Sequence, residues 1–179
     1  MKKNVLLWGL CGGLVITLTM LYSVSLCYTR ENFEGNMLLG YGSMLLAFSL
    51  IFLGVRNVRD RYQGGTITFG KAFRTGLYIS LTASTLYVAA WLVDYYVFVP
   101  DFMDKYTAVI IKQMQDSGAS ALEVELKAKE MASYREMYNN PAGIILLTYA
   151  EVLPVGLVVS LFAALILKKK RRNGSEISG

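Results

Sequence analysis

The chain has 179 residues, of which 54% are hydrophobic and 17% are charged, so it can form one compact domain but not a second catalytic domain of ordinary size. It contains no histidine, which removes the commonest general base, every Ser-His or Cys-His nucleophile and any Cys/His metal cluster. We therefore predict a protein that is not an enzyme and holds no cofactor or metal. The formal net charge of +5 is informative only together with the positions of the charged residues along the chain.

Four long apolar runs are predicted to be transmembrane helices, at about residues 5–28, 37–55, 75–99 and 142–167. Each is long enough to cross the ~30 Å hydrocarbon core as a helix, and none shows the polar face of a soluble helix. We predict a single all-α membrane domain of four helices over residues 1–172, followed by a short disordered tail at 173–179. Aromatic residues near the outer end of the third run are predicted to form an interfacial belt: Trp91, Tyr95, Tyr96 and Phe98.

Basic residues gather on one side of these runs. Twelve of the eighteen Lys and Arg residues precede the first run, separate the second from the third, or follow the fourth. Loops rich in Lys and Arg stay in the cytoplasm, so both termini are predicted to be cytoplasmic. The basic excess thus indicates orientation and contact with the lipid bilayer, not a nucleic-acid site. The residues expected at lipid headgroups are Arg56, Arg59, Arg61, Lys71, Arg74, Lys168, Lys169, Lys170, Arg171 and Arg172.

The longest polar segment, residues 100–141, is predicted to form an amphipathic helical hairpin on the outer side of the membrane. Apolar residues recur at helical spacing in its first half, and Ser120-Ala-Leu-Glu123 is a capping box that begins the second helix. Its Met- and Tyr-rich stripe is suited to packing on the bundle or lying in the interface. A groove for a periplasmic or membrane protein partner is the other interpretation.

Two carboxylates lie inside the predicted spans, Asp94 and Glu151. Glu151 lies about 13 Å into the fourth span, where a charge costs roughly 2.5–3.5 kcal/mol. Pro154 leaves the carbonyl of Ala150 without its helical donor, and oxygen ligands at broken helices form the ion sites of secondary transporters. Glu151, Asp94 and Pro154 are therefore the candidate proton or cation site. The alternative is a neutral Glu151 hydrogen-bonded to a hydroxyl, with Asp94 as an interfacial cap.

Small residues recur along three of the spans at a spacing that lets membrane helices approach closely. Spans three and four are expected to meet along these stripes, which would bring Asp94 and Glu151 to the same side of the bundle. The number of stripes also makes a homodimer possible. The residues predicted to pack in this way are Gly9, Gly13, Gly76, Ser80, Ser84, Gly156, Ser160 and Ala164.

Four segments in combination resemble a bacterial membrane-protein family known as domain of unknown function 4199. They are Tyr41 to Phe48, Gly64 to Phe73, Pro100 to Tyr106 and Glu151 to Gly156. The resemblance covers essentially the whole chain. It implies a multi-pass protein of the bacterial inner membrane with the hairpin in the periplasm, and it brings no activity or catalytic residue with it.

These observations favour a non-catalytic integral membrane protein that acts as a scaffold, an accessory subunit or a partner-binding module. The alternative is a small transporter, coupled to protons or cations through Glu151. Four spans leave little room for a pathway, so the transporter would have to be at least a dimer.

Overall fold

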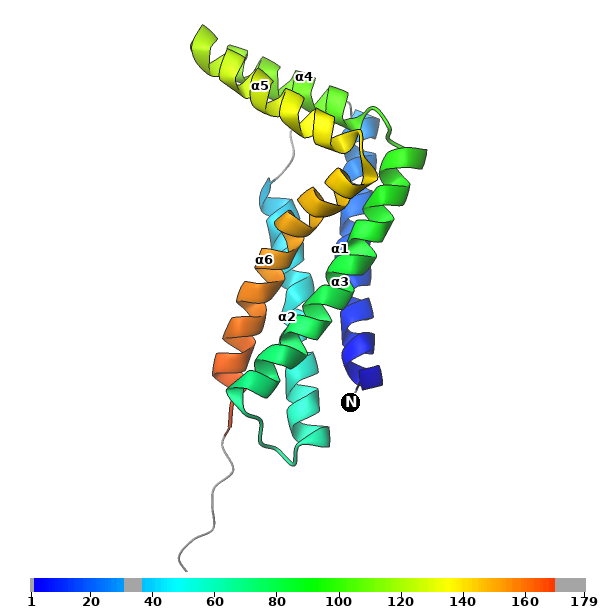
Figure 1. The fold of residues 1–179 in the computed structure, drawn as a ribbon, viewed down its shortest axis with the longest axis vertical. Helices are drawn as coiled ribbons and strands as arrows, with labels where there is room; N and C mark the ends of the chain where they lie inside the picture. Colours follow the sequence, from blue (N-terminus) through cyan, green and yellow to red (C-terminus); the bar gives the residue numbers. More distant parts are fainter. Residues whose placement is uncertain (1, 31–36, 170–179) are drawn as a thin grey trace, which may run out of the picture.

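The structure is a computed structural model that describes residues 2–30 and 37–169. The described residues form six helices and no strand, so the predicted all-α fold is confirmed there (Figure 1). The helices are α1 (Lys2–Arg30), α2 (Met37–Tyr62), α3 (Phe69–Val97), α4 (Phe102–Asp116), α5 (Ala121–Tyr138) and α6 (Pro141–Leu167). The tail predicted at 173–179 lies outside the described residues, as do three predicted headgroup residues, Lys170, Arg171 and Arg172.

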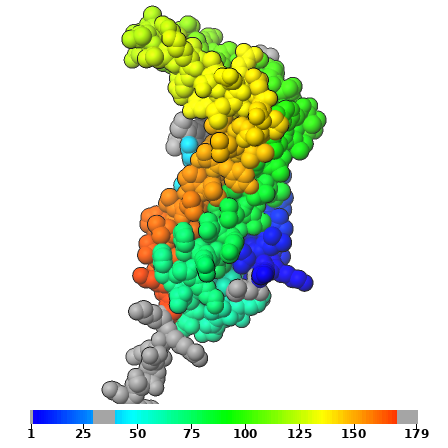
Figure 2. Space-filling model, viewed as in Figure 1, coloured from blue at the N-terminus to red at the C-terminus, as the bar shows by residue number. Residues whose placement is uncertain are grey.

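Four of these helices, α1, α2, α3 and α6, are long and apolar enough to cross a membrane. They form an elongated bundle in which α3 packs against α1 and α6 (Figure 1). The start of α1, the α2–α3 loop and the end of α6 lie at one end, which we call the basic end. Helices α4 and α5 lie side by side across the opposite end, the hairpin end, and project beyond the bundle (Figures 1 and 2).

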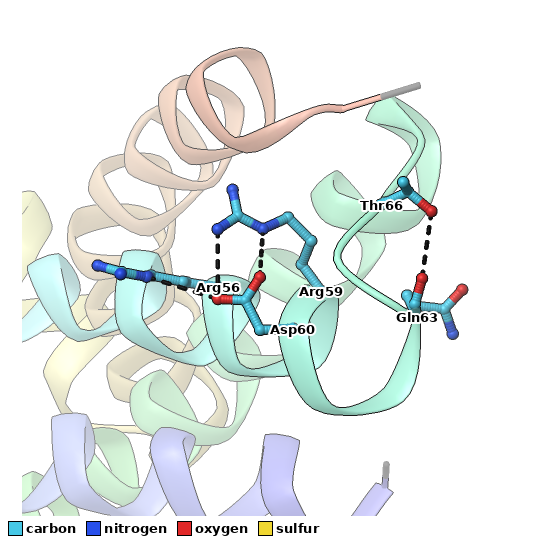
Figure 3. Close-up of polar contacts among 5 residues, drawn as sticks. All are labelled: Arg56, Arg59, Asp60, Gln63 and Thr66. Atoms are coloured by element: carbon cyan, nitrogen blue, oxygen red, sulfur yellow. Dashed lines mark hydrogen bonds and ion pairs between the residues drawn. The ribbon is translucent and has the colours of Figure 1, made fainter. Parts of the chain in front are cut away.

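The loop between α2 and α3 is shorter than the sequence predicted. Helix α2 continues through the charged residues to Tyr62, and α3 already begins at Phe69. The prediction ended both spans where charges begin, but charges do not end a helix when they can pair along it. Asp60 accepts a hydrogen bond from Arg59 at 2.7 Å and lies 3.6 Å from Arg56 (Figure 3).

The chain reverses direction at Gly64 and Gly65, whose φ angles of 60° and 80° suit glycine. Beyond this turn, the loop pairs with the end of α6 at the basic end. Ile67 donates to the Lys169 carbonyl at 3.0 Å, and Lys169 donates back to the Ile67 carbonyl at 2.9 Å. This antiparallel bridge joins the loop to the last span.

The predicted small residues lie where helices approach closely in the basic half of the bundle. A Cβ added to Gly156 would lie 1.9 Å from the Ser80 hydroxyl, and one added to Gly76 would lie 2.9 Å from Ser160. Ser84 and Ala164 are also buried. Gly9 and Gly13 approach α3 in the same way, at Thr82 and Ala83 respectively.

The two hairpin helices begin differently, and only α5 has a side-chain cap. At the start of α5, the capping box predicted from the sequence is confirmed: the Ser120 hydroxyl accepts from the Glu123 N–H at 3.3 Å, and the Glu123 carboxylate accepts from the Ser120 N–H at 2.8 Å. Near the start of α4, Asp101 accepts a hydrogen bond from the Tyr28 hydroxyl of α1 at 2.6 Å and pairs with Lys105 at 2.8 Å. The hydrogen bond between Tyr28 and Asp101 therefore joins the start of the hairpin to the bundle.

Candidate cavity beneath the hairpin

A cavity of about 530 Å³ lies between the hairpin and the spans. Helices α1, α3, α4, α5 and α6 all contribute to its wall. The lining is mostly aromatic residues and methionine, with one ion pair and one further carboxylate. The lining residues are Met20, Val24, Tyr87, Trp91, Phe102, Met103, Tyr106, Lys127, Glu130, Met131, Tyr134, Tyr138, Leu147, Thr148 and Glu151.

Helical spacing explains how three spans present side chains to the same cavity. Met20 and Val24 are four residues apart on α1, and Tyr87 and Trp91 are four apart on α3, so each pair lies on one face of its helix. Leu147, Thr148 and Glu151 form the corresponding face of α6. The large side chains at these positions hold the helices apart where the small residues of the basic half let them meet.

Aromatic contacts join the hairpin to the spans around this cavity. Trp91 packs edge-to-face on Phe102 of α4, with ring centroids 5.1 Å apart, and Tyr95 packs edge-to-face on Tyr138 of α5 at 5.2 Å. Trp91 and Tyr95 are 6% and 9% exposed. The belt prediction was therefore wrong for these two residues, because the docked hairpin buries them, whereas Tyr96 and Phe98 are exposed.

Glu151 lines the cavity and has no ion-pair or hydrogen-bond partner among the described residues. The other charged residues of the wall, Lys127 and Glu130, pair with each other at 2.8 Å. Burial raises the pKa of the Tyr138 hydroxyl, which lines the same cavity as Glu151. Within the described wall, Glu151 is thus the carboxylate that has no partner.

The structure does not bring the three candidate ion-site residues together. Asp94 is 8% exposed and does not line the cavity; its Oδ2 atom is buried without a hydrogen-bond partner. Its backbone carbonyl accepts from the N–H groups of Phe98 and Val99, so the main chain of Asp94 closes the end of α3. Pro154 lies inside the continuous helix α6, is exposed, and is not part of the cavity wall.

The predicted lipid-headgroup residues that the structure describes lie at the basic end. Arg59 is half-buried against Asp60, and Lys71 donates to the Gln63 side chain at 2.7 Å. The other described members of the set are exposed: Arg56, Arg61, Arg74, Lys168 and Lys169. This end therefore presents a mostly open basic surface.

The apolar stripe of the hairpin is divided between two environments. Met103 and Met131 are buried beside the bundle, whereas Leu122 and Leu126, on the projecting part of α5, are 65% and 57% exposed. Packing on the bundle thus accounts for only part of the stripe. The cavity beneath the docked part was not predicted from the sequence. The available signal was the four-residue spacing of Tyr87 and Trp91, which puts two large rings on one face of a helix.

Comparison with known proteins decides the family. The family model for proteins of unknown function DUF4199 matches residues 7–169. The chain belongs to this family. The matched range includes all four candidate spans in large part, the whole hairpin and every residue of the cavity wall, so the cavity lies within the DUF4199 region. No match was found among curated proteins or among solved structures.

Proposed function

We propose that this DUF4199 protein is a non-catalytic integral membrane protein that binds a small, largely apolar molecule beneath its hairpin. The observation that carries the proposal is the cavity of about 530 Å³, a size typical of small-molecule sites, which are mostly apolar with a few placed polar groups. This site is distinct from the hairpin groove for a protein partner expected from the sequence, which stays a prediction. The hairpin covers the site, and the spans supply its floor.

The proposal includes an orientation. The exposed basic surface supports a cytoplasmic position for the basic end, because Lys and Arg accumulate on that side of membranes. The hairpin end would then face the periplasm of a bacterial inner membrane. A thiol-reactive, membrane-impermeant reagent tests this orientation: in intact cells, a cysteine introduced at exposed Leu122 is expected to react, and one introduced at Arg61 is not.

Filling the cavity tests the binding function. Leu147 lines it, whereas the neighbouring Leu146 is 64% exposed on the outside of α6. Binding of the apolar fluorophore N-phenyl-1-naphthylamine would be measured for protein in lipid nanodiscs, with empty nanodiscs subtracted. Leu147→Trp is expected to weaken saturable binding at least about fivefold because its indole occupies the cavity, and Leu146→Trp is expected to leave binding unchanged. Equal binding by the two variants, or no saturable binding by the wild type, would contradict the proposal.

A second function, transport coupled to protons or cations, is favoured by one observation. Glu151 is a membrane-depth carboxylate that lines a cavity without a cationic partner among the described residues. An ion that binds it would raise the melting temperature of the folded protein. Melting of wild type and Glu151→Gln would be compared with sodium, potassium or calcium. An ion-dependent rise confined to the wild type supports this function, and identical responses of the two proteins oppose it.

A further inference from the structure

We infer that the cavity takes an organic cation, a molecule with an ammonium group and an apolar body, and that the ammonium lies beside Glu151. The inference rests on the proposed function and specifies its ligand. It follows from three features of the wall: its charge, the depth of that charge and the aromatic rings around it.

The wall contains one carboxylate without a cationic partner among the described residues. Lys127 and Glu130 neutralise each other at 2.8 Å, and Glu151 has no partner among the described residues. A carboxylate at this position is costly when ionised, and a ligand that brings a positive charge removes part of that cost. An anionic ligand would be repelled by the ionised carboxylate, and a neutral ligand would leave the ionised form without a counter-charge.

The depth of Glu151 requires a ligand with an apolar body. It lies ten residues along α6 from Pro141, about 15 Å at the rise of an α-helix. A small inorganic cation would leave the Met and aromatic side chains of the wall without contacts. An amine carried on an aliphatic or aromatic body satisfies the carboxylate and the apolar wall together.

The rings of the wall suit the same ligand. Six aromatic side chains line the cavity, on α3, α4 and α5: Tyr87, Trp91, Phe102, Tyr106, Tyr134 and Tyr138. Ammonium groups bind the faces of aromatic rings, and cages of such rings recognise quaternary ammonium ligands. Tyr87, Tyr138 and Glu151 line the same cavity, so a ligand inside it can contact rings and carboxylate together.

A matched pair of probes tests the inference. The protein has two tryptophans, and in a Trp8→Phe background the fluorescence reports on Trp91 of the cavity wall. In phosphatidylglycerol nanodiscs, 4-phenylbutylamine is expected to bind at least about tenfold more tightly than 4-phenylbutanol. Glu151→Gln is expected to abolish that difference by weakening amine binding alone. Asp94→Asn, which changes a buried carboxylate outside the wall, is expected to leave both affinities unchanged.

The outcomes separate the inference from the proposed function. If both probes bind equally and Glu151→Gln changes neither, the cavity binds small molecules but the organic-cation inference is wrong. If neither probe binds, both are wrong. Should the Trp8→Phe background not fold, the amine-dependent rise in melting temperature of the wild type and of Glu151→Gln gives the same comparison.

The ammonium group could come from a lipid or from a free amine, and a change of lipid distinguishes these sources. Adding phosphatidylethanolamine to the nanodiscs raises the apparent amine Kd of the wild type, but not of Glu151→Gln, if a lipid headgroup competes for the site. An unchanged Kd assigns the cavity to a free amine.

Discussion

The two halves of the bundle use opposite side-chain sizes to set the distance between the same helices. In the basic half, α3 and α6 meet through Gly76, Ser80, Gly156 and Ser160, all of which are buried. In the hairpin half, the same helices carry larger residues that face a cavity, among them Trp91. Without a hydrophobic drive between helices in lipid, close packing holds the first half together. The second half is completed by its docked hairpin, so close helix packing and the cavity lie in different places.

The largest effect is expected from overpacking the basic half. Gly156→Leu would place a side chain where a single Cβ already lies 1.9 Å from the Ser80 hydroxyl, so α3 and α6 would have to separate. We expect a loss of about 3 kcal/mol in the free energy of unfolding, measured by denaturation in detergent. Gly42→Leu on α2 is the control, because a Cβ there meets nothing within 4 Å. If the two variants are equally stable, close packing of α3 on α6 is not what stabilises the basic half.

An intermediate effect is expected from loosening the hairpin. Tyr28→Phe removes the hydrogen bond that the hydroxyl donates to Asp101 at 2.6 Å. Because this bond joins α1 to the start of α4, hydrogen exchange should become faster in α4 and α5 while the basic half stays protected. Tyr22→Phe, at an exposed position of the same helix, is the control. Uniformly faster exchange throughout the bundle would show that the two halves do not open separately.

The smallest effect, on the stability of the hairpin, is expected from lowering the pH. The pairing with Lys105, together with the Tyr28 hydroxyl, lowers the pKa of Asp101, and the capping contacts of Ser120 lower the pKa of Glu123. Because these carboxyl groups are more acidic in the folded hairpin, their contribution is complete above the unfolded pKa near 4 and is lost as the pH falls through the folded pKa. Exchange in α4 and α5 should therefore rise modestly below about pH 4. If the double variant Glu123→Gln, Asp101→Asn shows the same increase in exchange at low pH as the wild type, these two carboxyl groups are not its cause.

The sequence predicted what local patterns determine. Long apolar runs predicted four spans, and Ser120 with Glu123 predicted the start of α5, because a cap depends on residues close together in the chain. The end of α2 and the start of α3 were predicted wrongly. On α2, a charged residue such as Arg56 can stay within the helix because it pairs with Asp60 one turn away. The cavity could not be found in this way, because it depends on how the hairpin docks on Trp91, a contact between distant segments.

The backbone bridge between Ile67 and Lys169 has a consequence for how a molecule could enter and leave. Its two hydrogen bonds join the α2–α3 loop to the end of α6, so the spans cannot separate at the basic end without breaking them. The hairpin end is joined to the spans by ring contacts and by the Tyr28–Asp101 hydrogen bond, with no such backbone bridge among the described residues. If the cavity binds a molecule as proposed, these contacts place its expected entrance at the hairpin end.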